Sequence, residues 1–199
     1  MIPVFPTVYF GKVAYYRSLF SLQEIKIESK EHFIKQTFRN RCEILTSNGV
    51  QQLSIPVIRK NGSKTVIEDV EISNDTDWRK DHWKAIESAY SNSPYFEHYG
   101  NEVKKLIYQK ETNLLKFNHT IQSAIFSWFD IQIITSFTDE FSVQEKDFRS
   151  NLNQNRLNTN EDLKSYIQVF GDSSQFTSNL SILDALFCQG PMARNLISC

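Results

Sequence analysis

The chain has 199 residues, of which 40% are hydrophobic and 23% charged, and its formal net charge is −1 at pH 7. This length suits one domain with a substantial core, and the composition is that of an ordinary globular protein. The near-zero charge argues against a dedicated binder of duplex DNA, because such proteins gain much of their affinity by neutralising phosphates. No apolar run is long enough for a membrane span, and the N-terminal segment lacks the features of a signal peptide.

The three cysteines, Cys42, Cys188 and Cys199, are widely spaced. They fit neither a disulfide framework nor the spacing of zinc ligands, and they suit a reducing compartment. We therefore expect a cytoplasmic protein with no metal and no other cofactor. We expect a small-molecule ligand as its partner, without duplex nucleic acid or membrane insertion, and the oligomeric state stays open.

The first part of the chain predicts a β-α-β unit followed by a β-meander. Residues 4–10 and 24–29 read as strands, and the helical period over 12–20 would join them as parallel neighbours. Strands over 41–45 and 51–57 flank Asn48-Gly49, a strong hairpin signal, and a further strand is expected over 66–72 after the turn at Asn61-Gly62.

The second part predicts a helical layer and then a C-terminal strand and helix. Helices are expected over 77–91, 95–110 and 112–129, with Asn74, Asp75 or Thr76 as N-cap of the first. A strand over 131–137, a mobile polar loop or lid over 138–160 and a helix over 181–187 come next, and Gly190-Pro191 stops that helix. The predicted fold class is α/β: an opening β-α-β unit with an inserted meander, a helical layer and a mixed sheet, in one domain over residues 1–199.

Residues 77–86 are the most informative segment, because they combine two tryptophans and a histidine with basic residues. On a helix, Trp78 and His82 share a face. Rigid aromatic rings beside His and Arg are typical of one wall of a binding site, and Tyr95 lies shortly after. His82 could act as a general base or acid, or it could be a core histidine held by a hydrogen bond. Trp78 and Trp83 could stack on a ligand ring or anchor the core.

A second candidate cluster lies over residues 35–41. Lys35, Arg39 and Arg41 could hold a phosphate or a carboxylate, while Gln36 and Asn40 could recognise a sugar or a base edge. The alternative is a solvated loop whose charges serve solubility.

A third cluster lies over residues 176–187, where Asn179 or Asp184 could point into a site. Helix capping by Ser178, Asn179 and Ser181 accounts for most of the same residues. Glycine-rich phosphate loops are absent from this sequence, so a bound phosphate would be held by side chains or a helix N-terminus.

Taken together, these segments resemble the WbqC-like family of bacterial proteins, in the short form of Bacteroidetes-like bacteria. The resemblance also brings Tyr9 and Lys12 into the candidate binding set. It rests on these segments, in the order of the family: Tyr9-Phe10-Gly11-Lys12, Lys35 to Arg41, Asn48-Gly49, Leu53-Ser54-Ile55-Pro56-Val57, Trp78 to Trp83, Ser93-Pro94-Tyr95-Phe96, Tyr166 to Phe170 and Leu180 to Phe187.

Two departures from longer members of this family stand out. Those members begin with a His-Gln-Pro-like segment, whereas here Phe5-Pro6 stands at that place without the histidine. They also carry a Ser-Gly-containing segment where this chain has the polar stretch 138–160. If the missing histidine is catalytic in those members, this chain has lost or relocated the activity.

The resemblance implies a transferase of bacterial surface-polysaccharide (O-antigen-type) biosynthesis, which passes an acyl or aminoacyl group to a nucleotide-linked amino sugar. In that hypothesis the basic residues neutralise phosphate, the aromatic residues stack on a ring, and His82 takes the proton. The alternatives are a non-catalytic nucleotide- or sugar-binding protein and an accessory subunit of a biosynthetic enzyme.

Overall fold

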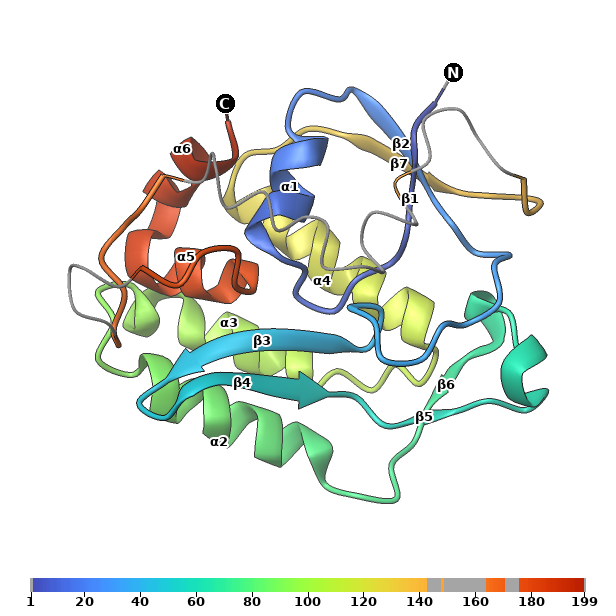
Figure 1. Ribbon diagram of the computed structural model, residues 1–199, viewed down its shortest axis with the longest axis horizontal. Helices are drawn as coiled ribbons and strands as arrows, with labels where there is room; N and C mark the ends of the chain where they lie inside the picture. The colour runs from blue at the N-terminus through green and yellow to red at the C-terminus, as the bar shows by residue number, and fades with distance from the viewer. Residues whose placement is uncertain (1, 143–147, 149–163, 171–175, 199) are drawn as a thin grey trace.

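The computed structural model describes residues 2–142, 148, 164–170 and 176–198 (Figure 1). The fold is mixed α/β, as predicted. A parallel sheet contains β1 (Val4–Phe5), β2 (Glu24–Ile27) and β7 (Ile134–Phe137) in the order β1-β2-β7. The helix α1 (Val13–Leu19) connects the first two strands, so the predicted β-α-β opening is confirmed.

The first strand is shorter than the predicted range of 4–10. It ends at Phe5, directly before Pro6, whose ring restricts φ. Further on, Phe10 takes a φ of +40°, which is incompatible with a strand. The segment between β1 and α1 is therefore a loop, and its side chains are buried.

The expected hairpin is present, but the meander is wrong. β3 (Arg41–Thr46) pairs with β4 (Gly49–Ser54) in an antiparallel register, and Gly49 supplies a φ of +97° at the turn. The ladder with β3 ends at Ser54, two residues before Pro56. Beyond this proline, β5 (Val57–Ile58) and β6 (Glu71–Ile72) form a separate two-stranded sheet.

The predicted strand over 66–72 is mostly a turn. Between β5 and β6 the chain forms two 3₁₀ turns, η1 (Gly62–Lys64) and η2 (Ile67–Asp69). The N–H of Val70 donates to the carbonyl of Ile67 at 3.2 Å, so it is not available to a neighbouring strand.

The three central helices lie close to their predicted bounds: α2 (Trp78–Tyr90), α3 (Phe96–Ile107) and α4 (Leu114–Trp128). The N-cap of α2 was predicted wrongly, because the capping residue is Asp77, which makes no side-chain cap bond. Asp75 instead accepts a hydrogen bond from Ser73 at 2.7 Å.

The C-terminal helix α5 (Ile182–Gln189) begins at its predicted cap, because the Ser181 hydroxyl accepts from the N–H of Leu183 at 3.3 Å. A 3₁₀ turn, η3 (Gly190–Ala193), and α6 (Arg194–Ile197) come after it and were not predicted. The expected mobile loop or lid over 138–160 lies mostly outside the described residues. None of the helices in the described residues is both long and apolar enough to cross a membrane.

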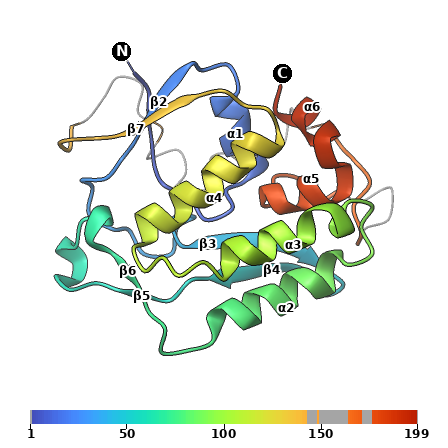
Figure 2. The same cartoon turned by 180° about the vertical axis from the view of Figure 1, so that it is seen from behind.

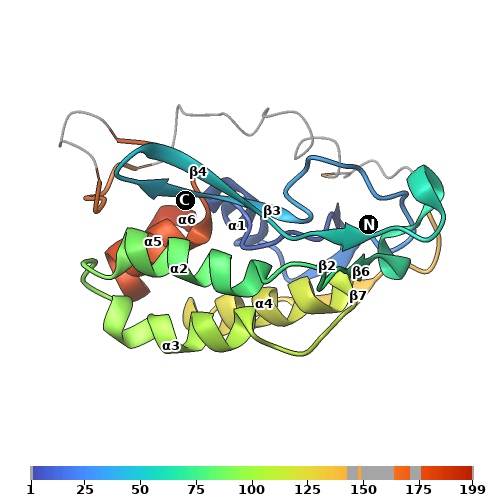
Figure 3. The same ribbon diagram turned by 90° about the horizontal axis from the view of Figure 1, so that it is seen from below.

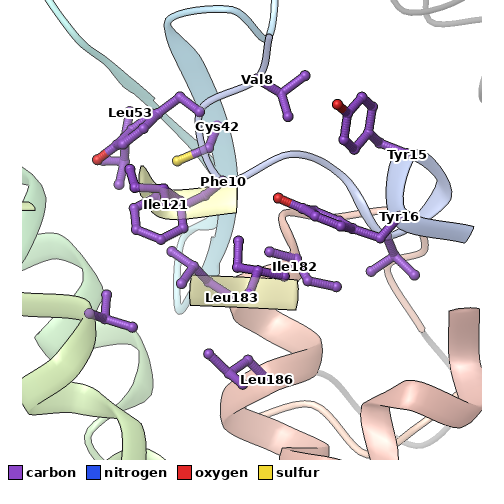
Figure 4. Packing of buried hydrophobic residues seen from close by; sticks show 14 of the residues in the cluster. Val8, Phe10, Tyr15, Tyr16, Cys42, Leu53, Ile121, Ile182, Leu183 and Leu186 are labelled. Carbon is purple, nitrogen blue, oxygen red and sulfur yellow. The ribbon is translucent and has the colours of Figure 1, made fainter. Parts of the chain in front are cut away.

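One hydrophobic core joins these elements. Figure 2 shows α2, α3 and α4 on one side of the molecule, and Figure 3 shows the β3–β4 hairpin across α2 from α3 and α4. Figure 4 shows buried side chains of Phe10, Cys42, Leu53 and Leu183 meeting from four segments of the chain. The core therefore holds together the very segments that carry the candidate motifs.

The turn after α5 depends on a glycine. Gly190 has a φ of +54°, and a Cβ added there would overlap the ring of Tyr95. Gly62 has a similar φ of +57° but faces open space. Gly62→Ala is expected to lose about 1–2 kcal/mol of unfolding free energy from backbone strain alone. Gly190→Ala should lose about 2–5 kcal/mol, because steric overlap adds to the strain. Urea denaturation of both variants measures this difference, and equal losses would contradict the overlap with Tyr95.

Candidate functional site

Four segments of the chain meet beside the first turn of α1 and form what we call the loop junction. It consists of Phe10, Lys12, Gln36, Phe38, Arg41, Glu43 and Asn179. Backbone hydrogen bonds fix these segments to one another. The N–H of Tyr9 donates to Phe38, that of Val13 to Leu180 and that of Ser181 to Glu43, at 2.9, 3.1 and 2.9 Å.

The backbone at the junction is strained. Phe10, Gln36 and Asn179 have φ values of +40°, +61° and +53°, a region that non-glycine residues seldom adopt. Hydrogen bonds hold two of these residues in place: the carbonyl of Phe10 accepts from the Ser181 hydroxyl at 2.7 Å, and Oδ1 of Asn179 accepts from the N–H of Ala14 at 3.1 Å. Strain of this kind persists where the surrounding structure enforces it, and it is concentrated at functional sites.

Lys12 provides a positive charge at the junction. Its side chain is only about a tenth exposed, and Nζ lies 3.0 Å from a carboxylate oxygen of Glu43 and 4.6 Å from the centre of the Phe38 ring. Arg41 lies two residues before Glu43 on β3 and so faces the same side of the strand. In the described part of the chain, the buried Nε of Arg41 has no hydrogen-bond partner. Two cations and one carboxylate leave this surface with a net positive charge that suits an anion.

The segment 35–41 is divided between the surface and the core. Lys35 and Gln36 are exposed and Arg41 is half-buried. Arg39, in contrast, is 1% exposed and forms a buried ion pair with Glu31, with Nη2 2.6 Å from the carboxylate. Asn40 donates from Nδ2 to the carbonyl of Ile55 at 2.8 Å. The structure therefore places Arg41 at the junction, half-buried, and buries Arg39 and Asn40 in the interior. A ligand-binding role for Arg39 and Asn40 stays a prediction.

His82 lies in the core beside Tyr9. The side chain is 5% exposed, and Nδ1 lies 2.9 Å from the Tyr9 hydroxyl. Burial lowers the pKa of His82 to about 4, although a hydrogen bond with the backbone of Ser54 and the charge of Asp81 act in the opposite direction. Burial also raises the pKa of Tyr9 well above its usual value. The ring is thus neutral at pH 7, with the Tyr9 hydroxyl donating to Nδ1, and its expected catalytic role stays a prediction.

The three candidate aromatic residues belong to the packing of the helices. Trp78 is 5.0 Å from the ring of His82, with the guanidinium of Arg79 4.5 Å above it. Trp83 stacks on Phe96 at 5.9 Å, and Tyr95 lies against Gly190. Trp78 and Trp83 are buried and Tyr95 is half-buried, so the described structure does not gather these rings at the loop junction. Their stacking on a ligand stays a prediction.

Asp184 is a fully buried carboxylate with three donors. It accepts from the hydroxyl of Tyr166 at 2.6 Å, from Nε2 of Gln168 at 2.8 Å and from the hydroxyl of Tyr90 at 3.1 Å. Burial raises the pKa of Asp184, while the three hydrogen bonds act to lower it. The two motif segments, 166–170 and 180–187, are therefore linked by hydrogen bonds to one carboxylate.

Sequence reasoning missed Glu43 and Asn118. Glu43 alternates with Arg41 along β3, and this two-residue period was the signal that both side chains face one surface. Asn118 is 1% exposed and donates to the carbonyl of Arg39 at 2.7 Å. Its signal was an amide among the buried apolar residues of α4.

The depressed pKa of His82 predicts a specific pH dependence. A buried histidine that stays neutral in the folded state binds its proton mainly after unfolding, so stability falls as the pH drops from about 6.5 towards 4. The slope approaches about 1.4 kcal/mol per pH unit. His82→Gln should remove this slope while keeping an acceptor for Tyr9, and His98→Gln, at an exposed site, is the control. Denaturation curves from pH 4 to 8 measure the effect. An unchanged slope in His82→Gln would mean that another group titrates.

The buried carboxylate gives a second prediction. Asp184→Asn turns an amide N–H₂ towards groups that need an acceptor, and the variant should lose about 1–3 kcal/mol or more. Tyr166→Phe removes one donor only and should cost about 1 kcal/mol. The double variant tests the coupling between the two residues, since strict additivity of the two losses would contradict a direct interaction.

Most of the chain, the charged residues of the junction included, matches a known protein family. The WbqC-like protein family matches residues 7–157, a range that includes Lys12, Arg41 and Glu43. The uncharacterized protein Rv1507c of Mycobacterium tuberculosis is 31% identical over 124 residues, which are 62% of this chain and 51% of that relative. The chain thus spans about half the length of the curated relative it matches. No solved structure matches this chain. The family match covers most of the residues, and the chain therefore belongs to the WbqC-like protein family.

Proposed function

We propose that the loop junction binds an anionic small molecule of the nucleotide-linked sugar class. In this proposal the protein is a transferase of bacterial surface-polysaccharide biosynthesis, which passes an acyl or aminoacyl group to an amino sugar. The observation that supports it best is the position of Lys12. Its mostly buried ammonium lies between Glu43 and the Phe38 ring, and Arg41 lies on the same face of β3 as Glu43.

The charges at the junction suit a phosphate. Lys12 can exchange Glu43 for a phosphate oxygen, and Arg41 can add a bidentate contact. Because Lys12 is largely removed from water, its attraction to an anion is less screened than that of a surface lysine. Gln36, exposed on the adjoining loop, can donate and accept hydrogen bonds with sugar hydroxyls.

The transfer step needs a proton acceptor near the ligand. The amine nitrogen forms a bond to the acyl carbon, the bond from that carbon to the donor's leaving group breaks, and the amine proton passes to a base. Glu43, once released from Lys12, is a carboxylate beside the bound ligand, so we assign it this role. His82 would then be a positioning residue, which holds the Tyr9 hydroxyl beneath the junction.

One observation favours a second candidate, a binding protein without catalysis. His82 is buried and neutral, with the Tyr9 hydroxyl on one nitrogen and a further hydrogen bond to the Ser54 backbone. If His82 is the base that the family chemistry requires, this chain would bind its ligand and not turn it over.

A thermal-shift panel of nucleotide sugars, nucleotides, acyl donors and amino acids tests the proposal. Lys12→Met and Arg41→Met should each weaken binding of a phosphate-bearing hit about 10- to 100-fold, the size expected for a lost charge-assisted hydrogen bond. Lys105→Met is the matched control, because Lys105 also forms an ion pair with a glutamate, Glu102, on an exposed helix face. The proposed site would be contradicted by a phosphate-bearing ligand that Lys12→Met and Arg41→Met both bind as tightly as the wild type does.

Turnover separates the two candidates. With a bound acceptor and an acyl donor, Glu43→Gln should lower the rate by roughly 10²–10⁴-fold if Glu43 is the base. His82→Gln should change the rate far less in that case. Tight binding with no product from the wild type would favour the non-catalytic candidate.

A further inference from the structure

The outer edge of β7 is unpaired in the described structure. β7 is the last strand in the order β1-β2-β7, and its other neighbour position is empty of any described strand. The opposite edge of the sheet differs, because the N–H of Phe148 donates to the carbonyl of Val4 on β1 at 3.0 Å. One edge of the sheet is therefore at least partly covered, and the other has no strand partner among the described residues.

The backbone groups on this edge can be assigned individually. The N–H groups of Ile134 and Thr138 donate to the carbonyls of Gln23 and Ile27, each at 3.0 Å. In a parallel pair, alternate residues face the neighbour, so Ile133, Thr135 and Phe137 turn N–H and C=O outward. Among the described residues, the outward groups receive one contact, a long 3.5 Å approach of the Thr135 hydroxyl to the Ile133 carbonyl. An exposed row of unpaired groups is a template for another strand.

The side chains along the edge are uncharged. Residues 131–138, Ile-Gln-Ile-Ile-Thr-Ser-Phe-Thr, contain no charged residue, proline or glycine. Ile134 is 69% exposed and Phe137 38% exposed. A groove of about 770 Å³ runs beside the strand, lined by Gln23, by residues of α4 from His119 to Ser127 and by 131–135, again without a charged residue. Burial lowers the pKa of His119, so this ring adds no charge near pH 7. Proteins usually protect exposed strand edges with charge, proline or a bulge, and β7 has none of these.

We propose that a second copy of this chain occupies the edge, with the two β7 strands antiparallel about a two-fold axis at Ile134. This register places Ile133 opposite Thr135 of the second copy, and the outward N–H and C=O groups of both residues then bond across the interface. It also brings the two exposed Ile134 side chains together as a cross-strand pair.

Two other axes are less favourable. An axis at Thr135 would place each exposed Ile134 opposite Ser136 of the second copy, so the two Ile134 side chains would not pair. The second is an axis at Ser136. It would place Asp139 opposite Ile133, whereas the axis at Ile134 pairs residues 131–137 with themselves and keeps every paired residue uncharged. The edge is thus self-complementary in charge and hydrogen bonding, which an isologous dimer requires. The inference does not depend on the proposed ligand.

Cross-linking tests the register. Residues on the axis form a non-hydrogen-bonded pair with Cα atoms about 4.5 Å apart, within the range that a disulfide spans. In a Cys199→Ser background, Ile134→Cys should give a disulfide-linked dimer on mild oxidation. Ser136→Cys, which faces residue 132 of the second copy, should not. A link through Ser136→Cys and not through Ile134→Cys would overturn the register.

Sedimentation of the full chain over a range of concentrations tests the dimer itself. Ile134→Lys places two like charges on the axis and should raise the dimer dissociation constant about tenfold or more. Thr135→Pro should act in the same direction, because it removes an outward N–H and leaves the bonds to β2 intact. Ile58→Lys is the control, since Ile58 is an exposed strand residue elsewhere. A wild type that stays monomeric, or a dimer that Ile134→Lys and Thr135→Pro leave unchanged, would overturn the proposal.

Discussion

The pairing of Lys12 with Ser181 is the constraint on which the rest of this structure depends. The two residues form an antiparallel bridge between the start of α1 and the start of α5. Around it, the Ser181 hydroxyl holds the carbonyl of Phe10, the Ser181 N–H binds Glu43, and Asn179 caps the backbone of α1. A single crossing of the chain thus positions Lys12, Glu43 and the strained Phe10 backbone. Without it, buried polar groups of three segments would lose their partners, which is costly in a core.

Charged residues at neighbouring positions of the chain differ in burial. Lys12 and Arg41 lie at the margin of the core, where an ammonium or guanidinium can meet both a carboxylate and solvent. Arg39, two residues before Arg41, points the other way and is neutralised by Glu31 in the interior. Such a buried pair holds two segments in register, and its net contribution to stability is small when desolvation is counted. The positive character of the junction therefore comes from the residues that the fold leaves at its edge.

Local sequence periodicity was sufficient to predict much of the fold, but it was not sufficient to predict the candidate site. The helices α2, α3 and α4 and the β3–β4 hairpin arise from patterns within 10 to 20 residues, and they were predicted correctly. The meander failed between β5 and β6, where two 3₁₀ turns replace most of the strand that the alternating pattern of residues 66–72 predicted. The motifs identified Lys12, Arg41 and Asn179, but they did not show which charged side chains face outward. The burial of Arg39 depends on Glu31 and Asn118, whose positions are set by tertiary packing and not by neighbouring sequence.

The crossing also sets an order of events during synthesis. The residue that secures Phe10 lies 171 positions later in the chain, so the β-α-β opening leaves the ribosome long before its final hydrogen bond can form. Contacts of such long sequence separation carry a loop-closure cost and form late in folding. Until the C-terminal residues are made, the carbonyl of Phe10 stays hydrogen-bonded to water and the first helix stays uncapped. The surface around Lys12 takes its final form only after Ser181 has been made.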